Sequence, residues 1–305
     1  MRAYRLVPVL VLIIVGLTLL GACKDKTPRT PGTATTTGGA TSGSNQGGTQ
    51  GTSGSQTGAI TLTTSDGVSI AAVFVKGSGE GPLPACLLVH MFGKDKSTYS
   101  DFQAKLADVG ISSLAIDLRG HGESTQGGTL DFKSLTDEQW ALAKNDLVAG
   151  LDNLRSRSDV NPAMIGIVGA SIGANLALVV AADQLSQGAP NPPKCLVLLS
   201  PGRNYHGIEP IPRARDVRHM PVYIVSAKED GQSFSTSQTL TNATKGELKE
   251  YEGKDHGTDL FTAHPELVGE IIQWIKNRVA SVATPAGSSP TDISQPTSTE
   301  GDGSR

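Results

Sequence analysis

The sequence is most informative at residues 165–174, which read Ile165-Gly166-Ile167-Val168-Gly169-Ala170-Ser171-Ile172-Gly173-Ala174. A short apolar, β-branched run ends at Gly169, a serine follows, and a helical pattern begins at Ile172. The pattern predicts a strand, a sharp turn and a helix, with Ser171 presented in the turn. The spacing G-x-S-x-G suits such a turn because its glycines let the helix pass close to the strand. We therefore expect Ser171 to be a nucleophile rather than a serine that only caps the helix.

Working outward, strand and helix patterns alternate along most of the chain. Strand patterns at 60–63 and 68–75 flank Ser65-Asp66-Gly67, which predicts a hairpin. The apolar run at 85–90 is typical of a strand buried on both faces of a parallel sheet. The later elements are expected at 99–108 (helix), 111–118 (strand), 137–156 (helix), 165–168 (strand), 172 onward (helix), 195–199, 222–225 (strands), 235–243 (helix), 248–251 (strand) and 260–279 (helix). This order predicts an α/β fold with a mostly parallel sheet and helices on both faces.

Composition excludes several classes of protein. The chain has 305 residues and a net charge of -3, so no overall positive field favours nucleic acid as a partner. It has three cysteines, too few for a disulfide framework, and their positions do not suit a cysteine-based zinc site. Cys86 and Cys195 lie in apolar strand-like runs, where we expect buried thiols. The sequence implies no metal and no cofactor.

The first 22 residues have the pattern of an export signal. Arg2 and Arg5 precede an apolar run at 6–20, which is short for a membrane span. The run ends in Leu20-Gly21-Ala22-Cys23, which resembles the bacterial lipobox. That resemblance implies cleavage before Cys23, attachment of lipid such as palmitate to Cys23, and a lipid-anchored protein of the bacterial cell envelope outside the cytoplasm. A plain signal peptide or an uncleaved anchor are the alternatives.

Two further segments differ in composition from the folded domain, which we expect at 59–282. Residues 23–58 are rich in Thr, Gly, Ser and Gln, so they cannot bury enough apolar surface to offset the entropy of ordering. We expect them to form a flexible tether that holds the domain on the order of 30 Å from its anchor. Residues 283–305 return to Ser, Thr, Pro and Gly, and we expect a disordered tail there.

A second motif supports the first. The stretch Asp117-Leu118-Arg119-Gly120-His121-Gly122-Glu123-Ser124 resembles the D-x-R-G-H-G-x-S segment after the fourth strand of the α/β-hydrolase superfamily, and Gly169 to Gly173 resembles its serine-bearing turn. The resemblance covers about residues 59–282 and is greatest to dienelactone-hydrolase-like proteins and acyl-esterases. We expect Asp117 and Arg119 to bond to each other and to brace this loop.

A serine nucleophile needs a base within hydrogen-bond reach, and that base needs a third group to orient it. Among the six histidines, His256 follows the last predicted strand, where the superfamily places its base. His264 lies inside a helix pattern, and His206 and His219 precede the strand before the expected acid. His256 therefore completes the superfamily's order of serine, acid and histidine.

The expected acid lies just after the strand at 222–225. Asp230 stands before a glycine a few residues past that strand, as the acid of the superfamily does. Glu229 is its competitor, and Asp255 is too close to His256 in sequence to orient the ring easily.

The negative oxygen of the tetrahedral intermediate needs backbone N–H donors. Ile172, directly after the nucleophile, should supply one donor. The second should follow the strand at 85–90, where His90-Met91-Phe92-Gly93 replaces the superfamily's frequent His-Gly-x-x. Alignment on the histidine makes Phe92 the donor, whereas alignment on the glycine makes Met91 the donor.

The sequence thus predicts a serine hydrolase that cleaves carboxylic esters of small molecules through an acyl-enzyme. About twenty residues separate Leu199 from Pro221, too few for a helical lid domain. The basic segment at 212–219 should lie over one edge of the site, as a solvated face or as a preference for acidic esters. A peptidase or transacylase of the same fold, and a binding lipoprotein without turnover, remain the alternatives.

Overall fold

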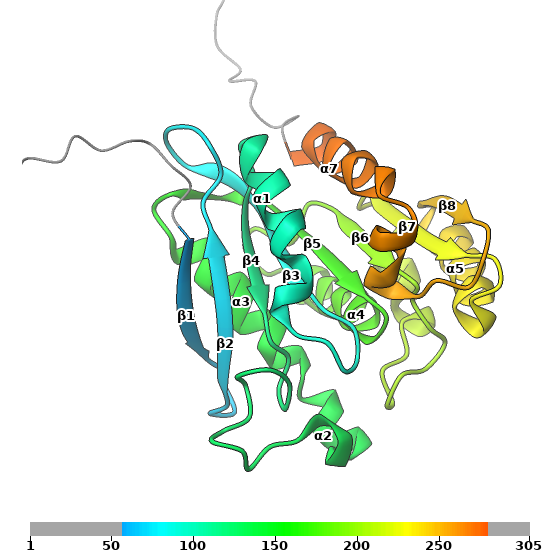
Figure 1. Cartoon of the computed structure of the whole chain (residues 1–305), viewed down its shortest axis with the longest axis horizontal. Coiled ribbons are helices and arrows are strands. Elements are labelled where there is room, and N and C mark those ends of the chain that lie inside the picture. The colour runs from blue at the N-terminus through cyan, green and yellow to red at the C-terminus, as the bar shows by residue number, and fades with distance from the viewer. Residues whose placement is uncertain (1–56, 280–305) are drawn as a thin grey trace, which may run out of the picture. The chain divides into compact units, whose positions relative to one another are not determined.

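A twisted eight-stranded sheet forms the centre of the computed structural model, which describes residues 57–279 (Figure 1). The expected export signal, lipidation site Cys23, most of the tether and the tail therefore lie outside the described residues. The strands run in the order β1-β2-β4-β3-β5-β6-β7-β8. Their bounds are β1 Thr57–Thr63, β2 Ser69–Val75, β3 Leu83–Val89, β4 Ser112–Ile116, β5 Val160–Ala170, β6 Leu196–Leu199, β7 Val222–Ala227 and β8 Glu247–Tyr251.

The pairing of the strands confirms the predicted fold class. Strands β1 and β2 form the antiparallel hairpin around Asp66-Gly67, and β2 also pairs antiparallel with β4. All other neighbours are parallel. The carboxyl ends of the parallel strands therefore meet at one edge, where an open α/β sheet builds its site.

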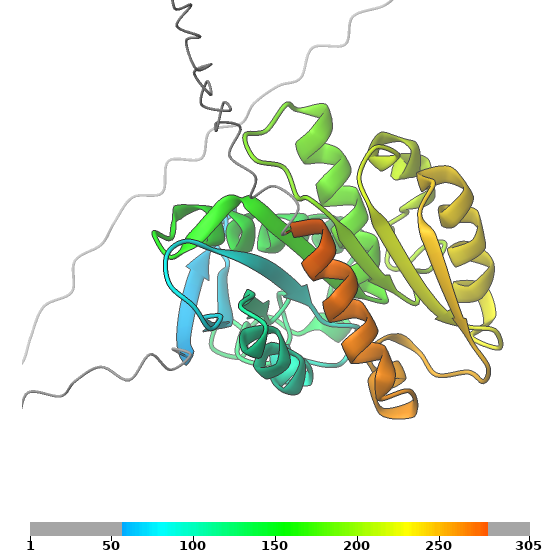
Figure 2. The same ribbon diagram turned by 90° about the horizontal axis from the view of Figure 1, so that it is seen from above.

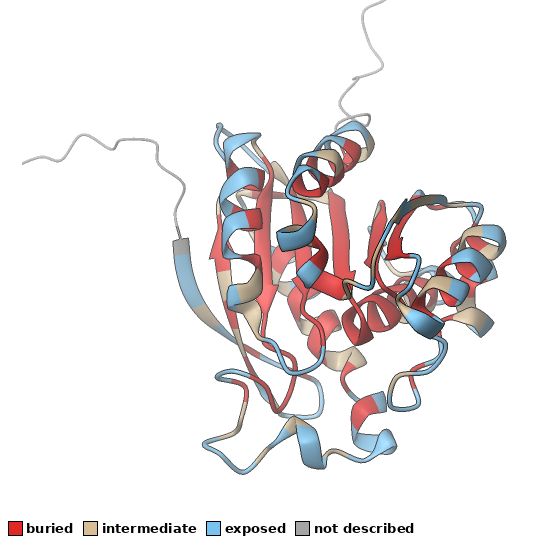
Figure 3. Cartoon of the chain, turned by 45° about the vertical axis from the view of Figure 1, so that its right-hand side comes forward, coloured by how far each residue is buried: buried red, intermediate tan, exposed pale blue. Residues whose placement is uncertain are grey.

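Helices cover both faces of the sheet (Figures 1 and 2). One face packs against α1 (Ser100–Asp108) and α7 (Glu266–Val279), and the other against α3 (Lys144–Ser156), α4 (Ile172–Ser186) and α5 (Gly231–Thr244). Alternate residues of the central strands enter the two cores, so these strands are apolar throughout, as the sequence predicted. Figure 3 shows the central strands buried, whereas β1 is largely exposed at the edge of the sheet. Cys86 and Cys195 are buried free thiols, as expected.

Two predicted helices are each interrupted. The segment at 137–156 forms α2 (Asp137–Ala141) and α3, because the chain between them turns through short-range backbone bonds that bring Trp140 into the core. The segment at 260–279 forms α6 (Leu260–Ala263) and α7, because Pro265 lacks an N–H and disfavours helical backbone at His264.

The loop after β4 is braced differently from the prediction. Asp117 does not bond to Arg119; it accepts from the backbone N–H and Nζ of Lys96, at 2.7 and 2.8 Å. Arg119 instead holds the buried carboxylate of Asp146, 2.7 Å from its Nη2, and reaches Asp66 in the hairpin. The strand has ended before Asp117, and the chain turns at 118–121, where the N–H of His121 donates to the carbonyl of Leu118 at 3.0 Å, so residues 117 and 119 meet different partners.

Candidate active site

Ser171 lies at the end of β5, in the sharp turn that leads into α4. Its backbone is left-handed, with φ at +53°, and its N–H donates to the carbonyl of Leu199 at 2.8 Å. The flanking glycines are required because a Cβ at Gly169 would lie 2.3 Å from the carbonyl oxygen of Gly173. A Cβ at Gly173 would in turn lie 2.5 Å from the carbonyl oxygen of Val89 at the end of β3. The motif therefore lets α4 start in contact with β3 and β5 and presents the serine at the sheet edge.

The structure brings Ser171, His256 and Asp230 into one hydrogen-bonded row. His256 Nε2 lies 2.8 Å from Ser171 Oγ, and His256 Nδ1 lies 2.8 and 2.9 Å from the two carboxylate oxygens of Asp230. Because a carboxylate only accepts, the proton of the neutral ring sits on Nδ1, and Nε2 is left to accept the proton of Ser171. Such a row can draw the proton from a serine hydroxyl. Glu229, the competitor of Asp230, is exposed.

Each member of the row is held by its own element. Asp230 follows β7 and stands before α5, where its carbonyl accepts from the N–H of Ser233 at 2.9 Å. His256 lies in the loop after β8, and the N–H of the next residue, Gly257, donates to Ser200 Oγ at 3.0 Å. Ser200 therefore ties the base-bearing loop to the end of β6, a link that the sequence analysis did not identify.

The expected oxyanion donors lie around the start of α4. Ile172 is the first helical residue, and Gly173 packs against the carbonyls of Val89 and His90, which places the next two residues of the β3 loop beside the helix start. Met91 is buried, and its sulfur would lie 2.5 Å from a Cβ at Gly257, next to the base. Within residues 57–279, no protein acceptor is found for the N–H of Ile172, Met91 or Phe92. Both candidates for the second donor therefore remain.

His90 fixes the peptide that joins these two candidates. Its Nε2 accepts from the N–H of Leu118 at 3.0 Å, so its Nδ1 donates to the carbonyl of Met91 at 2.8 Å. Burial lowers the pKa of His90, which keeps the ring neutral and suits this arrangement. Because the C=O and N–H of a trans peptide point in opposite directions, the N–H of Phe92 points away from the His90 ring.

An aromatic cluster extends from Phe92. The ring of Phe92, which is 40% exposed, stacks on His206 with centroids 5.1 Å apart, and His206 stacks on Trp140 at the same distance. His121 stacks on Phe132 at 4.0 Å and meets Phe92 edge-on. His121 is thus a packing residue, and burial lowers its pKa to about 4.

The basic segment at 212–219 lies away from the site, contrary to the prediction. It forms the 3-10 helix η3 (Ile211–Val217), in which Arg213 pairs with Asp183 near the far end of α4. Arg215 and Arg218 line a cavity with residues of the last turn of α5. Arg213 thus pairs within the fold, and the place of this segment removes the reason to expect acidic esters.

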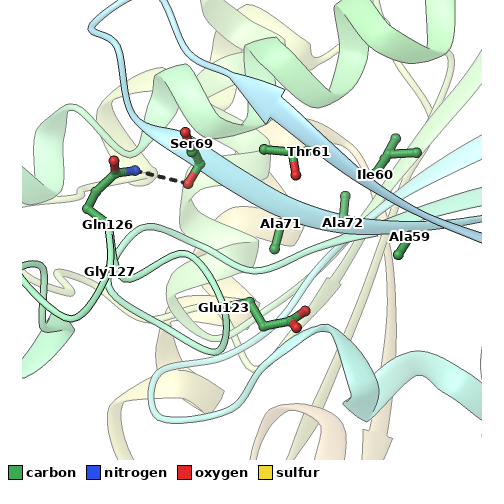
Figure 4. Close-up of a pocket in the computed structure, with 9 residues that line it drawn as sticks. All are labelled: Ala59, Ile60, Thr61, Ser69, Ala71, Ala72, Glu123, Gln126 and Gly127. Carbon is green, nitrogen blue, oxygen red and sulfur yellow. Dashed lines mark hydrogen bonds between the residues drawn. The ribbon is translucent and has the colours of Figure 1, made fainter. Parts of the chain in front are cut away.

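A cavity of about 500 Å³ lies at the hairpin rather than at Ser171 (Figure 4). It is lined by small and polar residues, and Gln126 crosses its rim to donate to the carbonyl of Ser69 at 3.2 Å. Neither Ser171 nor His256 lines it, so it is separate from the row of reactive groups.

In the described part of the chain, no group of three or more His, Cys, Asp or Glu side chains is arranged to hold a metal ion. Residues 57–279 also contain no helix with the length and apolar character to cross a membrane.

Residues 81–246, more than half of the chain, match the family model described as serine aminopeptidase, S33. The chain therefore belongs to this family of α/β-hydrolases, and it is a hydrolase.

Curated relatives match over shorter stretches. The putative hydrolase YtaP of Bacillus subtilis is 35% identical over 129 residues, which cover 36% of this chain and 43% of the relative. An uncharacterized protein of Mycobacterium tuberculosis is 29% identical over 147 residues, or 47% of this chain and 44% of the relative. The chain thus spans less than half the length of these relatives.

Solved structures share the fold at low identity. A dienelactone hydrolase of Anabaena variabilis has a TM-score of 0.56 at 18% identity, covering 74% of this chain and 98% of its own. An esterase of Pyrococcus furiosus has a TM-score of 0.58 at 16% identity, covering 74% of this chain and 92% of its own. A thermostable carboxylesterase from a metagenomic library has a TM-score of 0.57 at 19% identity, covering 75% of this chain and 90% of its own. These likenesses confirm the dienelactone-hydrolase-like fold that the sequence predicted.

Proposed function

We propose that this hydrolase cleaves carboxylic esters of small molecules through an acyl-enzyme on Ser171. The observation that carries the proposal is the hydrogen-bonded row from Ser171 through His256 to Asp230, with 2.8 Å at each end of the imidazole. A serine hydroxyl is a weak nucleophile at neutral pH, and an oriented imidazole is the group that activates it.

The reaction has two halves that use the same residues. In the first, Ser171 Oγ bonds to the ester carbonyl carbon while its proton moves to His256 Nε2. The tetrahedral intermediate collapses, the bond to the alcohol oxygen breaks, and His256 returns the proton to that oxygen. In the second half, water attacks the acyl-enzyme by the same proton transfers, which releases the carboxylic acid and regenerates Ser171. Asp230 orients His256, and the N–H of Ile172 with that of Met91 or Phe92 binds the negative oxygen.

Ester substrates are supported over peptides by the solved structures that share the fold. The fold neighbours include an esterase, a carboxylesterase and a dienelactone hydrolase, which supports an ester as the substrate. The family's name supports the alternative, an aminopeptidase. An aminopeptidase must bind the ammonium group of its substrate near the nucleophile, and the carboxylate of the reactive row, Asp230, is already hydrogen-bonded to His256.

We further propose that the domain works at the bacterial cell envelope, anchored through lipid on Cys23. The lipobox-like Leu20-Gly21-Ala22-Cys23 supports this location. Expression of the full chain with a palmitate analogue should label the wild type and leave Cys23→Ala unlabelled. Equal labelling of both would contradict the anchor without affecting the proposed reaction.

The reaction is tested by labelling the purified protein with a fluorophosphonate and measuring its intact mass. We expect one adduct on the wild type and none on Ser171→Ala. Ser186→Ala is a matched control that should be labelled like the wild type, since Ser186 is an exposed serine at the far end of α4 whose hydroxyl donates to the carbonyl of Asp183 at 3.0 Å. An adduct of equal yield on Ser171→Ala would refute the assignment of the nucleophile.

A further inference from the structure

The loop between β6 and η3 carries a tyrosine whose position is fixed by a tight turn. Tyr205 and Ile208 form an isolated antiparallel bridge, with the N–H of Ile208 donating to the carbonyl of Tyr205 at 2.9 Å. Between them, His206 and Gly207 both have positive φ, at +49° and +79°. Two central residues with positive φ are typical of a two-residue type I′ turn, which constrains the residues on either side. Tyr205 thus sits at a defined position rather than at the tip of an unpaired loop.

Asn175 clamps this loop to the helix of the nucleophile. It lies one turn after Ser171 in α4 and is fully buried. Its amide donates to the carbonyls of Gly202 and Ile208, each at 2.9 Å, and its oxygen accepts from the N–H of Gly202 at 3.0 Å. These three hydrogen bonds therefore fix the position of the loop relative to the helix that begins at the nucleophile.

The hydroxyl of Tyr205 points toward the reacting groups. Its oxygen lies 2.9 Å from Ser233 Oγ, and its ring stands edge-on to that of His256 with centroids 6.3 Å apart. The ring also fills the space above Gly202, where a Cβ would lie 2.2 Å from Tyr205 Cζ. Burial raises the pKa of Tyr205, although hydrogen bonds with Ser233 and Ser171 act to lower it. The phenol therefore keeps its proton at neutral pH and can donate a hydrogen bond to a substrate oxygen next to Ser171.

The order of the strands shows on which side of Ser171 this donor lies. Ser171 follows β5, and the expected oxyanion loop follows β3 on one side of β5, whereas Tyr205 follows β6 on the other side. Asp230 follows β7 and His256 follows β8, so the acid and base come from the same side as Tyr205. During acylation, that is the side on which the departing alcohol oxygen takes its proton from His256.

We propose that Tyr205 is a catalytic residue that donates a hydrogen bond to the departing oxygen, with Ser233 donating in turn to the Tyr205 oxygen. This inference rests on the proposed function. No bond to the Tyr205 hydrogen breaks; His256 supplies the proton that the alcohol oxygen gains as its bond to the acyl carbon breaks. The hydrogen bond matters most when the alcohol is a poor leaving group. The substrate class is therefore esters of alkyl alcohols.

The test compares two esters of the same short carboxylic acid, a methyl ester and a p-nitrophenyl ester, by kcat/KM. In Tyr205→Phe we expect a loss of about ten- to a hundredfold on the methyl ester, less than the roughly hundred- to thousandfold seen when a donor to the oxyanion is removed, because the alcohol oxygen also receives the proton of His256. On the p-nitrophenyl ester, whose oxygen leaves without help, we expect less than about a threefold loss. Ser233→Ala should also lower kcat/KM more on the methyl ester than on the p-nitrophenyl ester, but by a smaller factor than Tyr205→Phe.

Tyr223→Phe is the matched control, since Tyr223 is a buried tyrosine stacked on Trp274 and distant in the sheet from the nucleophile's turn. Tyr223→Phe should leave kcat/KM unchanged on both esters. Equal losses on the two esters in Tyr205→Phe, or no loss on either, would overturn the role of Tyr205. Labelling with fluorophosphonate separates this inference from the proposed function. Its leaving group is fluoride, which needs no donor, so labelling reports on the nucleophile and not on Tyr205. If the wild type is labelled at Ser171 but Tyr205→Phe affects the two esters equally, only this inference is overturned. If the wild type is not labelled, the proposed function and this inference are both contradicted.

Discussion

Asn175 allows the packing around the nucleophile to be tested quantitatively. Asn175→Ala removes three hydrogen bonds, at 2.9, 2.9 and 3.0 Å, and leaves two carbonyls and one N–H in the loop at 202–208 without their partner. A buried backbone group that loses its partner costs about 1–2 kcal/mol, so the free energy of unfolding should fall by about 3–6 kcal/mol. That is a large share of the roughly 5–15 kcal/mol by which a domain is stable.

The assay is urea unfolding followed by tryptophan fluorescence, together with esterase activity at a temperature where the variant is folded. Asn277→Ala is the matched control, since Asn277 is an exposed helical asparagine with one side-chain bond, to Gln273. It should change the free energy of unfolding by less than about 0.5 kcal/mol. An Asn175→Ala protein as stable as this control and as active as the wild type would refute the clamp.

Four other substitutions or conditions have defined outcomes. Asp230→Asn should fold normally and lower kcat by about 10⁴-fold, since His256 would then be held in the wrong tautomer; esterase kinetics measure this. Gly173→Ala should prevent soluble expression or sharply lower the thermal midpoint, because its Cβ would lie 2.5 Å from a backbone carbonyl oxygen. The pKa of His121 is lowered to about 4 from 6.5, so the unfolded chain binds more protons between these values and stability falls with falling pH. We expect a loss of about 2 kcal/mol from about pH 7 to about pH 5, less in His121→Gln, by urea unfolding. His206→Asn keeps a residue that tolerates positive φ but removes two ring stacks, and should cost about 1–3 kcal/mol of unfolding free energy by the same assay.

The fold was predictable because its signals are local. The strand, turn and helix at 165–174, the hairpin around Asp66-Gly67 and the apolar central strands all follow from short-range pattern and turn chemistry. The breaks in two helices were harder to predict. Pro265 marks one of them, whereas the break after Ala141 has no glycine or proline and follows from the burial of Trp140.

The reactive row was predictable from chain order, but its supports were not. Ser171, Asp230 and His256 were identified by their places after successive strands, and the structure brings them together. Their catalytic roles stay a prediction. Asn175 carried a signal that could have been noticed, a polar residue one turn after Ser171 in an apolar helix. Tyr205 carried none, because its partner at residue 233 lies in another element.

Charge pairing was the least predictable feature. Proximity in sequence suggested that Asp117 would bond to Arg119, yet the actual partners are Lys96 for the first and Asp146 for the second. The basic run at 212–219 was expected over one edge of the site, as a solvated face or as a preference for acidic esters, whereas Arg213 pairs with Asp183 away from the site. In both cases the partner is distant in sequence, and only the packing of the sheet and helices brings it near.

The central claim, an acyl-enzyme on Ser171, is tested most directly by quenching the wild-type protein with acid during turnover of a p-nitrophenyl ester. Peptide mass mapping should then find the acyl group on the peptide that contains Ser171, and the same treatment of Ser171→Ala should give neither adduct nor turnover. Steady turnover by Ser171→Ala, or turnover by the wild type with the acyl group on a different residue, would contradict the account.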